Sequence, residues 1–522
     1  MTAKGCNRNY SLFIFDKLDF KKEEFVMKNR QGVLYLIPKS SYYDSEKDMV
    51  AEGKRLHADM FNEDRELYTY LLYFKEATYY SKSLMMNNLL ANSLHKEENS
   101  ELLKRDPDLL KVEDALIMHA LFNENITHAL KMLLTLKESR LNNSRTSRII
   151  LQFIFDRGNT DTIAIKYRNK LKQLLIHALG LRTVNEILDR TYNGVKRFEK
   201  AIAIYDNPYG MEVFEFVFGR ETEFKSPKLQ EYMRMKKAFE NNSVDFREPT
   251  DLPIEVLIGF NNFYKTGYAL TSLIGLGNLS KKQKIQMQNT VKRHSNDKME
   301  LKIDLNEYSI MELYKYMYSK KDITPEEIEE CASIIEGKAT ELHKRIEDNF
   351  IVDLNNTALI IDCSDSNKGS AQTKLHPFFK NITLGNVLKG DKDIAVTYVG
   401  GIKEDGLFQP SGHTDLSSAL LKVAKEGYKN VIILSDGFEN VNNFDKTYKQ
   451  LKKIGYDLNV IHFNPVFSPK NFSFKEISPD IVAIPYTSEK DIENLMLFYL
   501  LNVDGEQFKK VMREKIESEL LA

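Results

Sequence analysis

Apolar residues recur three and four positions apart through most of residues 45 to 350, a pattern typical of amphipathic helices. Residues 163 to 180, IAIKYRNKLKQLLIHALG, place apolar side chains on one face, and Gly180 suits the left-handed turn that ends a helix. Thr183 and Glu186 then form a capping-box pattern, so the next helix is expected to begin promptly. Helices joined by such short loops predict a stacked antiparallel array of the HEAT type, although the sequence has no clean repeat period.

Two segments near the beginning of the chain are apolar without helical spacing. They are YSLFIF at residues 10 to 15 and GVLYLI at residues 32 to 37. We expect each to form a short strand or an extended packing segment.

From Thr357 onward, short β-branched runs alternate with helical segments. The strand-like runs are TALIID, DIAVTYVGG, NVIILSD, DLNVIHF and DIVAIPY, and helices are expected near 415 to 427, 443 to 455 and 489 to 502. This alternation predicts a doubly wound, Rossmann-like α/β domain with a largely parallel sheet. We therefore expect two domains, a mainly α domain over residues 1 to 350 and an α/β domain over residues 351 to 522.

Length and composition agree with a folded chain of two domains. A chain of 522 residues is too long for one core. Its three cysteines, Cys6, Cys331 and Cys363, form no CxxC pair, which predicts neither a disulfide framework nor a zinc site. No run of about 18 apolar residues occurs, so we expect a cytoplasmic protein without a membrane span.

Oxygen-bearing side chains gather at the ends of predicted elements in the α/β domain. The run DCSDS places Asp362, Ser364 and Ser366 just past the first strand. Thr414 lies in a loop before a helix, and Asp436 directly follows another buried strand. Ligands of doubly wound sheets bind at the carboxyl ends of the strands. Because Mg²⁺ prefers six hard oxygen ligands, these residues predict a site for Mg²⁺ or another divalent cation.

The five positions resemble, in order, the metal-ion-dependent adhesion site of von Willebrand factor A domains, over roughly residues 351 to 522. The resemblance implies that Ser364, Ser366 and Thr414 ligate the cation, while Asp362 and Asp436 mostly orient its waters and hydroxyls. It also implies an open coordination position that a carboxylate or phosphate of a partner fills.

Three points stay open at this site. The plainer alternative is that these oxygens only satisfy strand ends and helix starts. Asp365 either strengthens cation binding or faces solvent. The short stretch from Asn367 to Asp393 allows an abbreviated first helix.

A helical array followed by such a domain resembles the TROVE, or Ro autoantigen-like, family. Similar-looking segments follow in the family's order: YLLYFKEATYY at residues 70 to 80, YALTSLIGLGNLS at 268 to 280 and YSIMELYKYMYS at 308 to 319. The resemblance implies a closed ring of HEAT-like repeats that binds the ends of misfolded RNA in its hole and small Y RNAs on its outer surface. No DNA partner is expected.

Positive charge is concentrated in one part of the helical region. Residues 131 to 200 carry fifteen Lys and Arg against six Asp and Glu, a net charge of +9, which leaves −10 for the rest of the chain. Cations and amides on a helix face suit phosphate contacts, although such faces are also commonly only solvated. The basic stretch at residues 281 to 294 extends the same pattern. The candidate RNA-binding residues are Lys137, Arg140, Arg145, Arg148, Lys166, Arg168, Lys170, Lys172, Gln173 and His177.

Two other functional classes are enzymes and protein-interaction adaptors. No P-loop, HExxH or GxSxG motif occurs, and no base accompanies the Asp and Ser of DCSDS, so we expect no catalysis. The alternative to RNA binding is a von Willebrand A-domain adaptor for a MoxR-type AAA+ ATPase or another protein complex. An adaptor would use the same metal site but would not need a coherent basic surface.

Overall fold

The structure is a computed structural model. It describes residues 30–36, 46–75, 77–91, 109–122, 126–138, 150, 160–178, 210–219, 223–295, 301, 303–320, 322–347, 356–369, 374–390, 394–404, 407–468, 473–486 and 488–521. Contacts divide the chain into two compact units, a sheet unit and a helical unit. The sheet unit comprises the described residues within Met1–Leu56, Glu76–Thr78 and Asp304–Glu519, and the helical unit comprises those within His57–Lys75, Tyr79–Ile303 and Leu520–Ala522.

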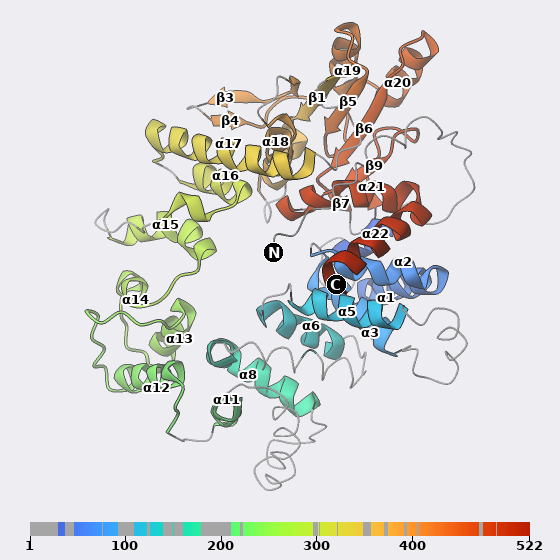
Figure 1. Cartoon of the computed structure of the whole chain (residues 1–522). Helices are drawn as coiled ribbons and strands as arrows, with labels where there is room; N and C mark the ends of the chain where they lie inside the picture. Colours follow the sequence, from blue (N-terminus) through green and yellow to red (C-terminus); the bar gives the residue numbers. More distant parts are fainter. Residues whose placement is uncertain are drawn as a thin grey trace, which may run out of the picture. The chain divides into compact units, whose positions relative to one another are not determined.

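The helical unit contains no strand among its described residues. Its elements are α2 (Arg65–Tyr70), η2 (Leu71–Tyr73), α3 (Tyr79–Ala91), α5 (Leu109–Phe122), α6 (Ile126–Glu138), α8 (Thr160–Ala178), α11 (Gly210–Phe218), α12 (Pro227–Glu240), α13 (Ile254–Tyr264), α14 (Leu270–Leu276) and α15 (Lys281–Ser295), while α1 (Glu46–Glu63) has residues in both units. Helices close in sequence pack on one another, including α12 on α13, α13 on α14 and α14 on α15 (Figure 1). The predicted mainly α class is therefore confirmed, while closure into a ring stays a prediction.

Within the apolar segment predicted at residues 32 to 37, residues 32 to 35 are helical and form neither a strand nor an extended segment, so the prediction for them is wrong. Residues Arg30–Tyr35 form a 3₁₀ helix, η1, in the sheet unit. Val33 and Leu34 are buried, and η1 packs on α21 (Leu495–Val503). Tertiary packing outweighs the β propensity of this short run. Residues 10 to 15, Gly180 and Thr183 lie outside the described residues.

The sheet unit is built on five parallel strands in the order β2-β1-β5-β6-β9. The strands are β1 (Thr357–Asp362), β2 (Ala395–Val399), β5 (Asn430–Leu434), β6 (Asn459–Asn464) and β9 (Ala483–Pro485). Each lies within one of the runs predicted from sequence or extends it by one residue. The predicted parallel α/β domain is therefore confirmed.

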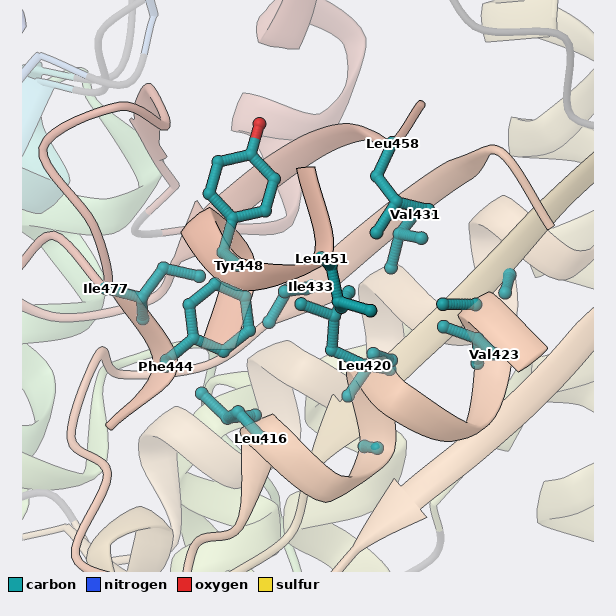
Figure 2. Close-up of a cluster of buried hydrophobic side chains, with 14 of the residues drawn as sticks. Leu416, Leu420, Val423, Val431, Ile433, Phe444, Tyr448, Leu451, Leu458 and Ile477 are labelled. Atoms are coloured by element: carbon teal, nitrogen blue, oxygen red, sulfur yellow. The ribbon is translucent and has the colours of Figure 1, made fainter. Parts of the chain in front are cut away.

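Helices cover both faces of this sheet. On one face, α19 (Leu416–Lys425) and α20 (Phe444–Lys453) bury a continuous apolar cluster against β1 and β5 (Figure 2). The cluster includes Leu416, Leu420, Val423, Val431, Ile433, Phe444, Tyr448 and Leu451. Burial of each aliphatic side chain stabilises the fold by about 1.5–3 kcal/mol.

The opposite face is covered by α18 (His376–Lys389). A Cβ atom at Gly385 would lie 2.5 Å from Ile361 Cδ1, so a glycine is required where α18 approaches β1. The expectation of an abbreviated first helix is wrong, because residues 374 to 390 accommodate a helix of 14 residues.

Further elements surround the sheet. They are η4 (Leu305–Glu307), α16 (Ile310–Ser319), α17 (Pro325–Glu347), η6 (Asp365–Lys368), the hairpin of β3 (Ile402–Glu404) and β4 (Leu407–Gln409), the hairpin of β7 (Phe467–Ser468) and β8 (Ser473–Phe474), η7 (Glu489–Asn494) and α22 (Gly505–Leu520). Helices α16 and α17 belong to this unit although they precede residue 350. The predicted boundary at 350 itself stays a prediction. No helix in the described part of the chain is both long and apolar enough to cross a membrane.

Candidate metal centre

The five predicted metal-site residues come together at the carboxyl ends of β1 and β5. β1 pairs with β2 on one side and with β5 on the other, so the chain leaves β1 in one direction and returns on its opposite side. In open α/β sheets this reversal of strand order opens a crevice at the strand ends. Asp362 ends β1, and Asp436 lies two residues past β5.

Three hydroxyl groups converge in this crevice. Ser364 Oγ lies 2.9 Å from Ser366 Oγ and 2.6 Å from Thr414 Oγ1, although 50 residues separate Ser364 from Thr414. Ser364 and Thr414 are fully buried. The α19 helix begins directly after this loop, capped by Asp415, whose carboxylate accepts from Ser418 N. The hydroxyl cluster is thus a shared feature of two loops from distant parts of the chain.

A glycine permits the loops to approach this closely. Gly400 has φ of +70°, a conformation that favours glycine, and a Cβ atom there would lie 2.5 Å from Ser411 O and 3.0 Å from Ser364 Cα. The backbone bonds from Ser411 N to Cys363 O and from Gly401 N to Ser411 O join the same loops.

The two carboxylates are buried and held by hydrogen bonds. Asp362 Oδ1 accepts from Ser364 N at 3.0 Å, its Oδ2 accepts from Ser435 Oγ at 2.7 Å, and Asp436 Oδ1 accepts from Phe438 N at 3.0 Å. Burial raises the pKa of Asp362. Burial, together with the nearby Asp362 carboxylate, raises the pKa of Asp436 to about 6. Two neighbouring carboxylates in a poorly solvated crevice favour a bound cation.

Four residues that position the site were not predicted. Ser435 bonds to Asp362, while Asn381 Nδ2 on α18 donates to Asp362 O and to Asn367 Oδ1, both at 3.1 Å. Asn440 Oδ1 accepts from Thr414 N at 2.9 Å. Only Ser435 had a sequence signal, since it stands directly before Asp436.

The rim of the crevice combines an apolar and a basic side chain. Phe438 is 50% exposed, and Lys475 Nζ lies 3.3 Å from the centre of its ring. Burial lowers the pKa of Lys475, and the Asp436 carboxylate opposes that shift. Asp365 faces solvent, where its carboxylate pairs with Lys368 Nζ at 2.6 Å.

The donor set suits Mg²⁺ better than a transition metal. Adjacent ligands of an octahedral Mg²⁺ with bonds of about 2.1 Å lie about 3.0 Å apart. The separation of 2.9 Å between Ser364 Oγ and Ser366 Oγ is close to that value, whereas the 2.6 Å between Ser364 Oγ and Thr414 Oγ1 is shorter and would have to widen around a cation. In the residues that the structure covers, no group of three His, Cys, Asp or Glu is placed to hold a metal. A cation here therefore depends on hydroxyl oxygens.

The predicted RNA-binding residues are only partly described. The structure describes the side chains of Lys166, Arg168, Lys172 and Gln173, all on α8. Lys137 and the pair Lys170 and His177 lie in helices, but their side chains fall outside the description, and Arg140, Arg145 and Arg148 lie outside the described residues.

The described cations of α8 have partners within the helical unit. Lys166 Nζ pairs with Glu255 Oε1 of α13 at 2.8 Å. The Arg168 guanidinium lies 4.8 Å from the centre of the Phe216 ring. α8 is kinked at Tyr167, between these two cations. Lys166 and Arg168 therefore do not form one continuous row of unpaired cations along α8.

Comparisons with known proteins give a structural likeness at low sequence identity. No family model matches the chain, and no curated protein matches it. The crystal structure of the Deinococcus radiodurans Ro (RSR) protein is similar to this chain with 12% sequence identity and a TM-score of 0.31, over 78% of this chain and 94% of that one. The chain is thus similar to a Ro protein, the family that its sequence resembles, and at this TM-score the likeness adds nothing to the case for its fold or function.

Proposed function

We infer that this chain is a non-catalytic binding protein of the Ro type whose sheet unit holds Mg²⁺ or a similar divalent cation at an adhesion site. The observation that carries the proposal is the convergence of three hydroxyl groups beside two buried carboxylates at the strand ends. The plainer alternative is that these side chains only cap helices and satisfy strand ends. That role does not require the hydroxyl groups of serine and threonine residues from two distant loops to lie in contact.

Each residue has a distinct part in the proposed site. Ser364, Ser366 and Thr414 present neutral oxygens, so they bind a cation without cancelling its charge. Asp362 is held by hydrogen bonds from Ser435 Oγ and from the Ser364 amide. In the proposed site it does not contact the cation itself but orients the hydroxyl groups that do. Bound Mg²⁺ would supply an open coordination position for a carboxylate of a protein partner.

Titration calorimetry of the full chain with Mg²⁺ or Mn²⁺ tests the site. The unaltered chain is expected to bind one divalent cation, and Asp436→Ala should abolish that binding. Strand β5 precedes Asp436 and is buried by α19 and α20, so the fold should survive. Asp365→Asn is the matched control, because this exposed carboxylate pairs with Lys368 and should leave binding unchanged. Equal binding heats for the chain and Asp436→Ala would contradict the proposal.

RNA binding by the helical unit is the second proposed function, with small structured or misfolded RNA as the partner. Its support is the net charge of +9 in residues 131 to 200 of a chain whose total charge is −1. Lys166 would have to exchange Glu255 for a phosphate. A cytoplasmic location belongs to the same proposal.

Filter binding at several salt concentrations tests the RNA proposal. Lys166→Gln with Lys170→Gln should weaken binding across RNA sequences and lower the log-log salt slope by roughly 0.7–0.9 for each lost phosphate contact. Glu255→Gln should have the opposite effect. It removes the ion-pair partner of Lys166, so the lysine is free to contact a phosphate and RNA binding should tighten. If neither change alters affinity or slope, the adaptor alternative for an AAA+ ATPase or another protein complex becomes the better account.

A further inference from the structure

The sheet unit contains a cavity whose lining includes none of the five candidate metal-site residues. Its volume is about 470 Å³, and it is lined by residues of α16, α17, α18, β2 and the β3–β4 hairpin. Figure 1 shows the hairpin beside α16, α17 and α18. The volume lies in the range of about 300–1,000 Å³ that is usual for small-molecule sites.

Aromatic rings form much of the cavity wall. Tyr314 and Tyr318 come from α16, Tyr398 from β2 and Phe408 from β4. The Tyr398 and Phe408 rings lie 5.2 Å apart at 54°, and Tyr398 is 51% exposed. A ring that is held on one side and open on the other is a surface on which a flat heterocycle can stack.

A polar pair interrupts the aromatic wall. Asn386 Nδ2 donates to Tyr314 Oη at 2.6 Å, and Tyr314 is 91% buried. This bond uses the phenol oxygen as an acceptor, so within the described residues the phenol proton and Asn386 Oδ1 have no other hydrogen-bond partner. A donor and an acceptor side by side match the edge of a nucleobase.

The charged groups of the lining favour an anion. Lys389 at the end of α18 and Lys403 on β3 are exposed, and neither forms an ion pair within the part of the chain that the structure covers. Glu336 on α17 is the one carboxylate among the lining residues described. The lining therefore carries a net charge of +1. The Glu336 carboxylate can in addition accept hydrogen bonds from the hydroxyl groups of a sugar.

We propose that this cavity binds a nucleoside monophosphate, with the base on the Tyr398 and Phe408 rings, its edge at Tyr314 and Asn386, and the phosphate at Lys389 and Lys403. An aliphatic ligand would fit the apolar walls but would leave the two lysines and the polar pair unused. The lining of this cavity shares no residue with the hydroxyl cluster.

Equilibrium binding of AMP and GMP to the full chain in EDTA tests this proposal, since chelation removes any contribution of a divalent cation. Saturable binding in the micromolar to millimolar range is expected. Tyr398→Ala should weaken it roughly 5- to 150-fold, the range seen when a stacking ring is removed. Lys389→Ala with Lys403→Ala should weaken AMP at least about tenfold while leaving adenosine unchanged, because a charge-assisted hydrogen bond to phosphate is lost.

The control variants separate this site from the rest of the unit. Lys422→Ala removes an exposed lysine of α19, and Asp436→Ala alters only the candidate metal centre, so neither should affect AMP binding. Circular dichroism confirms that each variant is folded. The proposal is overturned if millimolar AMP and GMP do not bind, if inorganic phosphate competes as well as AMP, or if only a fatty-acid probe occupies the cavity.

Discussion

His462 is enclosed completely in the middle of the parallel sheet, on β6. Its Nε2 donates to Ser435 O at 2.9 Å, while its Nδ1 has no hydrogen-bond partner in the described structure. Burial lowers the pKa of His462 to about 4 from an ordinary value of 6.5. The folded protein therefore holds this ring neutral in a range where the unfolded chain binds a proton.

The sign of the resulting pH dependence follows from that difference. The stability linked to His462 is fully present above pH 6.5 and is lost as the pH falls from 6.5 to about 4. At pH 5 the loss amounts to about 2 kcal/mol of unfolding free energy. His462→Gln keeps an N–H donor but cannot titrate, so its unfolding temperature should fall less between pH 7.5 and pH 5 than that of the unaltered chain.

Thermal unfolding followed by circular dichroism at the two pH values measures this effect. His413→Gln, in an exposed loop, is the control. Parallel pH curves for the chain and for His462→Gln would show that another group dominates acid sensitivity.

Individual side chains of the candidate metal centre were predictable only where an oxygen-bearing residue type directly follows a predicted strand. Asp362 and Asp436 follow buried β-branched runs, which marks them in the sequence. Asn381 lies on the buried face of a helix, and its bonds to the site depend on how α18 lies against β1. The pairing of Lys166 with Glu255 joins residues 89 positions apart, so no local pattern reveals it.

Helices α16 and α17 are attached to the sheet unit through α18. His343 Nδ1 of α17 bonds to Val387 O at 2.8 Å, and the Tyr314 ring stacks on Phe379 with centroids 6.1 Å apart. A Cβ atom at Gly390 would lie 2.5 Å from the His343 ring, so the two helices approach closely. These contacts make α16 and α17 part of one packed body with the sheet.

A comparison of two fragments tests this attachment. A fragment from Asp304 to Ala522 should unfold at a temperature several degrees above that of a fragment beginning at Glu347, because the shorter one exposes the face of α18 that α16 and α17 bury. Equal unfolding temperatures would mean that these helices contribute no stability and that the domain begins near residue 350.

Elements with strong periodic patterns were predicted well, and elements defined by packing were not. The buried strands and α19 and α20 combine clear runs with turn residues, so their positions followed from the sequence. The β3–β4 hairpin has strands of three residues, too short to carry a period. The apolar composition of residues 32 to 37 predicts a short strand or an extended segment, and the 3₁₀ helix η1 is set by packing that composition does not reveal.

The sheet unit is assembled from separate stretches of the chain, with the described residues near the N-terminus and those after Asp304 in one compact body. A prediction that assigns each domain one continuous range cannot express this arrangement. The alternation of strands and helices located the α/β part correctly, whereas nothing in the local sequence indicates that residues 30 to 36 join it.

The packing of η1 on α21 also affects how the chain can fold during synthesis. Tyr35 and Phe474 meet edge to face at 6.1 Å, and η1 contacts a helix that ends at Val503. At about 5–20 residues per second, a ribosome needs roughly 25 to 95 seconds to make the chain between Tyr35 and Val503. During that interval the apolar side chains of Val33 and Leu34 lack the cover that α21 gives them in the folded chain, so η1 reaches its native packing only late in synthesis.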